Sequence, residues 1–292
     1  MTGIGGILSY PFMVHAFEAG TIVAVVCGAM GWFMVLRRQT FAGHTLALVG
    51  FPGAAGAVLF GVSAALGYFA FCVAAAVIIG GAAGSAEAPS YRDESALIGT
   101  VQAMALGLGF LFVSLYHGNL TGLTGLLFGS FLGITGRQVV VLLVVGAAAV
   151  LALAAIGRPV LFVSVDPDVA EAAGLPVRAL TVGFLVLLGI AVAEASQITG
   201  SLLVFALLVL PPATAQVITG RPMLGIGLAV GIGVAVTWVG LVVAFYTPYP
   251  PGFYLTTIGF AAYVVARAVR GLQARRWRSA TAELVLGAVG GP

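Results

Sequence analysis

The chain has 292 residues, of which 61% are hydrophobic and 7% are charged, and its formal net charge is +3. Soluble domains carry about a quarter charged residues, so the composition excludes a soluble globular protein and indicates a protein that crosses the membrane many times. Lysine is absent, so the twelve basic residues are all arginine.

Nine apolar runs come close to the roughly 20 residues that a helix needs to span a bilayer. Two of them meet between Gln197 and Gly200 with hardly any polar linker, so a broken or re-entrant helix and a count of eight stay open. We therefore predict an all-α polytopic membrane protein with eight or nine transmembrane helices. The expected spans are residues 16–36, 43–64, 66–86, 95–116, 138–157, 178–197, 199–219, 223–246 and 252–270.

The arginines indicate how the chain is oriented, because short cytoplasmic loops retain positive charge. With the N-terminus outside and an odd number of spans, every arginine except Arg137 falls on the cytoplasmic side. We therefore expect a multi-pass protein with a cytoplasmic C-terminus.

A cluster of acidic residues lies between two of the spans, in the stretch "SVDPDVAEAAGLPV" at 164–177. Asp166 is a suitable N-cap for a short helix, and Pro167 suits the first turn because no donor is needed there. Asp168 and Glu171 lie near the positive end of the helix dipole. The pattern predicts a short cytoplasmic helix at about 164–175.

The end of this short helix is also marked in the sequence, because Gly174 and Pro176 are typical of a helix terminus. Val169, Ala170, Ala172 and Ala173 would form its apolar surface. Two interpretations stay open at this point. The helix either binds a partner protein or is a well-capped loop that keeps two spans apart.

Two glutamates fall within apolar runs, where burial of a charge is costly and an ionisable side chain is a functional candidate. Glu194 is expected toward the outer end of its span, as a weak candidate for the entrance of a cation path. Glu18 is expected to reach interfacial water. No His-Glu-x-x-His or Gly-x-Ser-x-Gly segment is present, so we expect no catalytic residues and no enzymatic activity in this chain.

The Pro211–Pro212 pair removes two backbone donors and should break or kink its span. It is a candidate hinge beside a transport path, and a static kink is the alternative. The patterns Gly28-x-x-Gly31 and Gly53-x-x-Gly56 predict close packing of neighbouring helices.

The sequence after the last span is rich in arginine and reads "RAVRGLQARRWRS". We expect a membrane domain over residues 1–274 and a basic, loosely structured tail over 275–292. In a membrane protein such a tail most simply contacts anionic lipid headgroups, and nucleic acid is not an expected partner.

Six segments, in the right order along nearly the whole chain, resemble the ABC-3 family of bacterial permeases, which import zinc, manganese and iron. The stretch at 164–175 is similar to the family's coupling segment, Ser-x-Asp-x-x-x-Ala followed by Gly. The other similar segments are "GAMGWFMVLRRQTFAGHTLALVGFPGAAGA" at 28–57, "DESALIGTV" at 93–101, "GLLFGSFLGIT" at 125–135, "TGSLLVFALLVLPPATA" at 199–215 and "FYTPYPPGFYLTTIGFAAYVVA" at 245–266.

The resemblance implies a permease subunit in a bacterial cell membrane. Two such subunits, expected to be identical, would sit on a cytoplasmic ATPase dimer and receive metal from an extracytoplasmic binding protein. Without lysine the chain has no phosphate-binding loop of its own, so it is expected to bind no cofactor, and its partner hydrolyses ATP. The residues implied to dock into the ATPase are Asp166, Asp168, Ala170, Glu171 and Gly174.

The resemblance also implies a metal path in the second span, where the family has an Asp and a His four residues apart. The matching positions here are His44 and Leu48. A histidine nitrogen suits zinc and other transition metals, so His44 is the path candidate, whereas Leu48 supplies no ligand. The alternative for His44 is an interfacial histidine bonded to a backbone carbonyl.

We therefore predict a permease of an ATP-driven importer for zinc or manganese. A permease for a metal chelate or a cobalamin-like cofactor is the main alternative, because Leu48 weakens the case for a free ion. A secondary transporter is less favoured, since no aspartate lies at mid-depth in a span to couple transport to an ion gradient.

Overall fold

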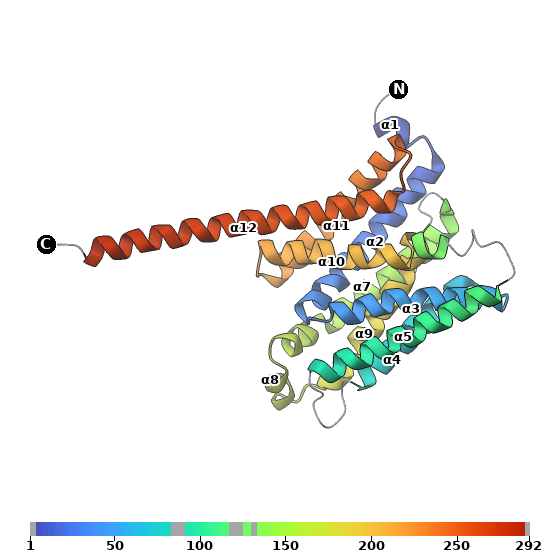
Figure 1. Cartoon of the computed structure of the whole chain (residues 1–292), viewed down its shortest axis with the longest axis horizontal. Helices are drawn as coiled ribbons and strands as arrows, with labels where there is room; N and C mark the ends of the chain where they lie inside the picture. The colour runs from blue at the N-terminus through green and yellow to red at the C-terminus, as the bar shows by residue number, and fades with distance from the viewer. Residues whose placement is uncertain (1–3, 83–90, 117–124, 130–132, 290–292) are drawn as a thin grey trace.

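The computed structural model describes residues 4–82, 91–116, 125–129 and 133–289, and the described segments contain helices and no strand (Figure 1). The side chains from residue 275 onward lie outside the described part, as does His117. The helices are α1 (Ile4–Ile7), α2 (Pro11–Leu36), α3 (Thr40–Leu59), α4 (Ala64–Ala82), α5 (Tyr91–Leu115), α7 (Gly136–Val165), α8 (Pro167–Ala172), α9 (Val177–Thr199), α10 (Ser201–Ile218), α11 (Pro222–Tyr246) and α12 (Pro251–Val289).

Nine of the described helices are long and apolar enough to cross a membrane, which confirms the all-α polytopic fold. The expected end of the fifth span at residue 157 is wrong, because α7 continues through Pro159 to Val165. One proline removes one hydrogen bond from a helix interior. The apolar run that follows Pro159 keeps the helix going.

The two runs that meet near Gln197 form separate helices. Gly200 divides α9 from α10 with a backbone φ of 76° and ψ of 157°, a conformation that favours glycine. Its backbone also lies against that of a neighbouring turn, since a Cβ on Gly200 would come within 2.3 Å of the Leu127 oxygen and the Gly129 nitrogen. The junction is therefore a tight break between two helices that are each long enough to span a membrane, and the described part of the chain contains nine such helices.

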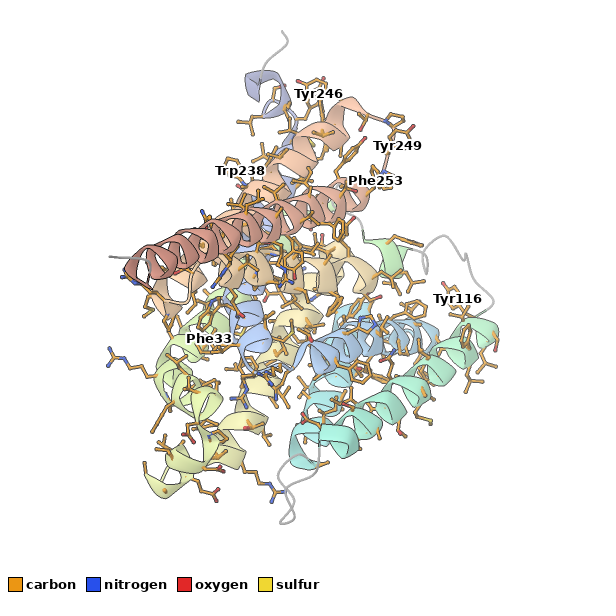
Figure 2. The ribbon with its side chains drawn as sticks, turned by 60° about the vertical axis from the view of Figure 1, so that its left-hand side comes forward. Phe33, Tyr116, Trp238, Tyr246, Tyr249 and Phe253 are labelled. Atoms are coloured by element: carbon orange, nitrogen blue, oxygen red, sulfur yellow. The ribbon has the colours of Figure 1, made fainter. Side chains whose placement is uncertain are left out.

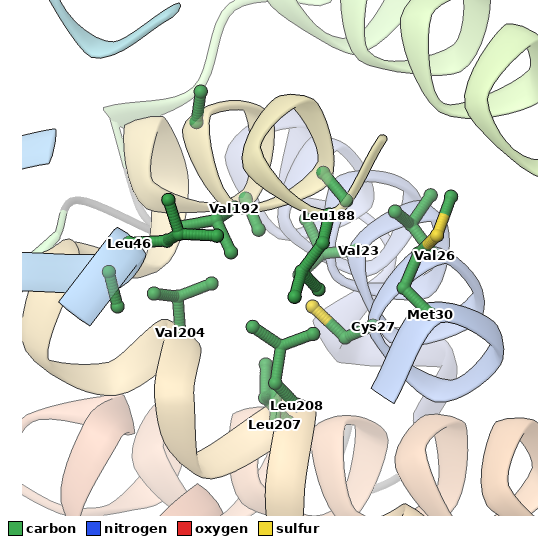
Figure 3. Packing of buried hydrophobic residues seen from close by; sticks show 14 of the residues in the cluster. Val23, Val26, Cys27, Met30, Leu46, Leu188, Val192, Val204, Leu207 and Leu208 are labelled. Carbon is green, nitrogen blue, oxygen red and sulfur yellow. The ribbon is translucent and has the colours of Figure 1, made fainter. Parts of the chain in front are cut away.

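Helix α2 lies at the centre of the bundle and packs against α7, α9, α10 and α11. Figure 3 shows its Val23 and Cys27 facing Leu188 of α9 and Leu208 of α10. These side chains are at most 1% exposed, so they form a dry core. The two cysteines of the chain, Cys27 and Cys72, are buried free thiols.

Glycines bring the helices close together, as their spacing predicts. A Cβ on Gly53 of α3 would lie 2.3 Å from the backbone oxygen of Gly67 in α4. On Gly31 of α2, a Cβ would lie 2.1 Å from the oxygen of Leu208 in α10. These distances are far below van der Waals contact, so the glycines allow one backbone to pack directly on the other.

Helix α10 runs without a break through Pro211 and Pro212, so the expected break is absent. Pro212 cannot donate to the carbonyl of Leu208, four residues earlier. That carbonyl and the Pro212 ring both lie against Gly31 of α2. Close packing on a neighbouring glycine thus accommodates the proline pair within a continuous helix.

The last helix is longer than expected. Helix α12 continues to Val289 and extends well beyond the other helices (Figure 1), so the prediction of a loosely structured tail over 275–292 is wrong for the backbone up to residue 289. Residues 272–286 contain neither glycine nor proline and are rich in alanine, leucine and arginine, which are good helix formers.

Candidate cation path and coupling face

The short helix predicted in the acidic stretch is present as α8, Pro167–Ala172. Asp166 is its N-cap, and the Oδ1 atom accepts a hydrogen bond of 3.0 Å from the backbone N–H of Val169. Pro167 occupies the first position and Asp168 the first turn. The sequence therefore defines the start of α8 through the residues that cap it.

The end of α8 is equally well defined. Gly174 has a φ of 82°, and the backbone N–H groups of Gly174 and Leu175 donate to the carbonyls of Glu171 and Ala170, at 2.9 and 3.0 Å. This is the Schellman arrangement, in which a glycine in the left-handed region closes the helix. Both caps make α8 a rigid projection between α7 and α9.

The side chains of α8 divide into one inward contact and an exposed face. Ala170 is fully buried and fixes the helix to the bundle. Asp168, Val169 and Glu171 are exposed, with Val169 52% accessible. The expected apolar surface is therefore divided, because Ala170 faces the bundle while Val169 and the acids face outward.

His44 lies deeper in the bundle than the beginning of a span suggests. Its ring centroid is 4.6 Å from that of Phe205 in α10. Its neighbour Thr45 donates a hydrogen bond of 2.9 Å to Gln102, which lies near the middle of α5. This hydrogen bond to the middle of another helix places the second turn of α3 inside the bundle.

The His44 ring is half-buried, and its Nδ1 atom is fully buried without a hydrogen-bond partner. Nδ1 therefore makes no hydrogen bond to a backbone carbonyl of the described residues. Leu48, one turn further along α3, is also half-buried. The described residues contain no group of three or more His, Cys, Asp or Glu side chains that could hold a metal ion.

Glu194 is 2% exposed in the interior of the bundle. Neither carboxylate oxygen has a hydrogen-bond partner. The carboxylate lies against α7, where a Cβ on Gly146 would come within 3.0 Å of the Glu194 Oε1 atom and 2.9 Å of Val26 in α2. Glu194 is therefore a buried acid between α2, α7 and α9, whereas Glu18 is exposed.

A polar junction at one end of the bundle, close to α8, was not predicted as functional from the sequence. Arg37, which follows α2 directly, reaches Ser164 of α7 and Thr181 of α9. Burial lowers the pKa of the Arg37 guanidinium, and the nearby Glu94 carboxylate partly opposes this effect. The ordinary arginine pKa is above about 12, so the group stays charged. The Arg37–Arg38 pair was the only signal of this site in the sequence.

The described residues thus form a bundle with nine helices long and apolar enough to cross a membrane, a half-buried histidine and a short helix projecting at one end, an arrangement that suits a membrane-embedded transport subunit. The model of the ABC 3 transport family matches residues 9–270. The chain therefore belongs to the ABC 3 transport family.

Curated relatives cover nearly the whole chain. The manganese transport system membrane protein MntC of Halalkalibacterium halodurans is 28% identical over 280 residues, which are 95% of this chain and 94% of the relative. MntC of Listeria innocua is 27% identical over 266 residues, covering 91% and 93% of the two chains.

Solved structures show the same fold. PsaBC from Streptococcus pneumoniae in complex with Fab superposes with a TM-score of 0.79 at 25% identity, and the match covers 90% of this chain and 93% of that chain. A transporter described as a metal-chelate type ABC transporter in an inward-facing conformation has a TM-score of 0.72 at 16% identity, covering 88% and 85%. The second likeness concerns the fold alone.

Proposed function

We propose that this chain is the permease subunit of an ATP-binding-cassette importer for divalent metal ions, with manganese as the first candidate and zinc as the second. The structural observation that carries the proposal is the His44 ring, whose buried Nδ1 atom has no partner among the described residues. The relatives named for manganese transport support the choice of metal.

The partners follow from the same assignment. The exposed acidic face of α8, at Asp168 and Glu171, would dock into a cytoplasmic ATPase dimer that hydrolyses ATP. An extracytoplasmic binding protein would deliver the metal at the opposite end of the bundle, and a second copy of this chain would complete the path. The C-terminus is then cytoplasmic in a bacterial cell membrane, and α10 at Pro211–Pro212 is the proposed hinge.

A single nitrogen ligand suits a cation that must leave as readily as it enters. Manganese prefers oxygen ligands, and zinc accepts nitrogen and sulfur readily. His44 with bound water would hold either ion weakly. The buried Glu194 side chain, once ionised beside an entering cation, would lower the energy of that cation inside the low-dielectric bundle. Transient binding, rather than a resident metal, is the expected behaviour.

The test of His44 uses cells that express this chain with its ATPase and binding protein, in which manganese, iron, cobalt and zinc are measured. His44→Ala is expected to lower accumulation of the transported metal about tenfold, the effect of about 1.4 kcal/mol, because the path loses its only nitrogen ligand. The control is Phe205→Leu, which removes the ring beside His44 and keeps the imidazole. Selective uptake that is indifferent to His44→Ala would remove this residue from the path.

The proposed role of Glu194 is tested by Glu194→Gln, which keeps the shape of the side chain and removes the negative charge. We expect metal uptake to fall severalfold while the melting temperature of the purified protein is unchanged or rises, because an uncharged amide costs less to bury. Full uptake by the glutamine variant would show that the carboxylate does not act on the cation.

Import of a metal chelate is the second candidate, and Leu48 favours it, because an apolar residue stands where the family has a ligand. The same cells distinguish the two functions. Accumulation of free manganese or zinc supports the first, whereas no change in any free metal and uptake of the chelated form supports the second.

A further inference from the structure

The guanidinium of Arg37 is half-buried in the bundle, and each of its three nitrogen atoms donates a hydrogen bond. Its Nη1 donates to Ser164 Oγ at 3.1 Å, its Nη2 donates to Thr181 Oγ1 at 2.9 Å, and its Nε donates to Gln39 Oε1 at 3.1 Å. The Cζ atom lies 5.4 Å from the centre of the Phe184 ring. One half-buried side chain therefore joins the end of α2 to α7 and α9.

The two helices that Arg37 reaches are the ones that carry α8. Ser164 lies in the last turn of α7, two residues before the N-cap Asp166, and its own hydroxyl donates to the carbonyl of Val160. Thr181 lies in the second turn of α9, which begins shortly after α8 ends. Arg37 therefore contacts a side chain on each of the two helices that flank α8.

Arg37 also adjoins the turn that leads into α3, the helix that carries His44. The chain turns sharply after α2, where Arg38 has a left-handed backbone φ of 57°, and α3 then begins at Thr40 and carries His44. Arg37 thus lies between the short projecting helix and the corner from which α3 starts.

We propose that Arg37 is the residue through which movement of α8 reaches the α2–α3 corner and His44. This inference rests on the proposed function, since it assumes that α8 docks with an ATPase. Hydrogen bonds from a planar guanidinium are directional. When Ser164 or Thr181 moves, the Arg37 side chain must therefore move with it to keep the hydrogen bond. A lysine ammonium keeps the charge but has a single nitrogen, which cannot reproduce this fork or its stacking on Phe184.

The test uses the full complex of this chain with its ATPase and binding protein, reconstituted in liposomes, with manganese as the probe. Metal uptake and ATP hydrolysis are measured together. For Arg37→Lys we expect the number of ions imported per ATP to fall about tenfold, a normal size for coupling between sites. The matched control is Arg38→Lys, the same substitution at the exposed neighbour, which should keep the wild-type ratio.

Two further variants leave Arg37 in place and remove one acceptor each. Ser164→Ala and Thr181→Val should each lower the ratio of ions to ATP, and neither should add its full effect to that of Arg37→Lys, because the three residues act as one unit. A merely structural role would lower assembly or stability and leave the ratio of the surviving complex unchanged.

The outcomes separate this inference from the function on which it rests. If the wild-type complex imports no manganese or other divalent metal, the proposed function is overturned. If the wild type imports metal and Arg37→Lys keeps the same ratio as Arg38→Lys, Arg37 does not transmit the movement of α8. A variant complex that loses stability in proportion to its uptake also overturns the proposal.

Discussion

Replacing Gly31 with alanine is expected to destabilise the protein by about 3 kcal/mol. The new Cβ would lie 2.1 Å from the Leu208 oxygen and 2.8 Å from the Pro212 ring. The carbonyl belongs to the backbone, so α10 as a whole would have to move away from α2. The purified variant should melt at a temperature lower by about 8 °C.

The matched control for Gly31 is Gly227→Ala in α11, where an added Cβ meets nothing within 4 Å. Alanine is the better helix former, so this variant should be as stable as the wild type. Equal melting temperatures for the Gly31 and Gly227 variants would contradict the close packing of α2 on α10. Metal uptake by the Gly31 variant should also be lost, because α2 and α10 both adjoin the proposed path.

Reversing the charge of α8 is expected to have the second large effect. Asp168→Arg combined with Glu171→Arg should reduce metal uptake at least about tenfold, because two exposed acids proposed to face the ATPase become repulsive to it. The caps Asp166 and Gly174 stay in place, so α8 should keep its shape. Uptake and the amount of ATPase that purifies with the membrane-inserted chain are the two measurements.

Two controls separate docking from general damage by the α8 charge reversal. Asp168→Asn with Glu171→Gln removes the charges without reversing them, and its effect should be smaller. Glu18→Arg reverses an exposed acid near the N-terminal end of α2 and should leave ATPase binding unchanged. Normal uptake and normal ATPase binding by the charge-reversed α8 would reject its assignment as the coupling helix.

The short helix α8 was predictable because its causes are local. Asp166, Pro167 and Gly174 act on backbone groups within a few residues of themselves, and the structure has each of them in the expected role. The depth of His44 was not predictable in this way. It depends on Thr45 meeting Gln102, a residue far away in the sequence.

The wrong predictions concern where helices end or break, and they too were made from local patterns of residues. A proline pair usually interrupts a helix, but Pro212 lies against Gly31 of another helix, and packing outweighs the local preference. Two helices are also longer than predicted. Arg158 and Pro159 suggested an end for α7 at residue 157, and the arginine cluster suggested a loose tail after residue 274, but the residues that follow continue both helices, to Val165 and Val289.

The sequence by itself determined that the chain is a helical membrane protein with eight or nine spans and where the capped helix α8 lies, because apolar length and capping act over short distances. Only the tertiary structure decided which side chains meet. The burial of Glu194, the position of His44 beside Phe205 and the junction of Arg37 with Ser164 and Thr181 all require helices that are distant in sequence to pack together. Such contacts follow from how whole helix surfaces fit one another, and no local pattern of residues encodes that fit.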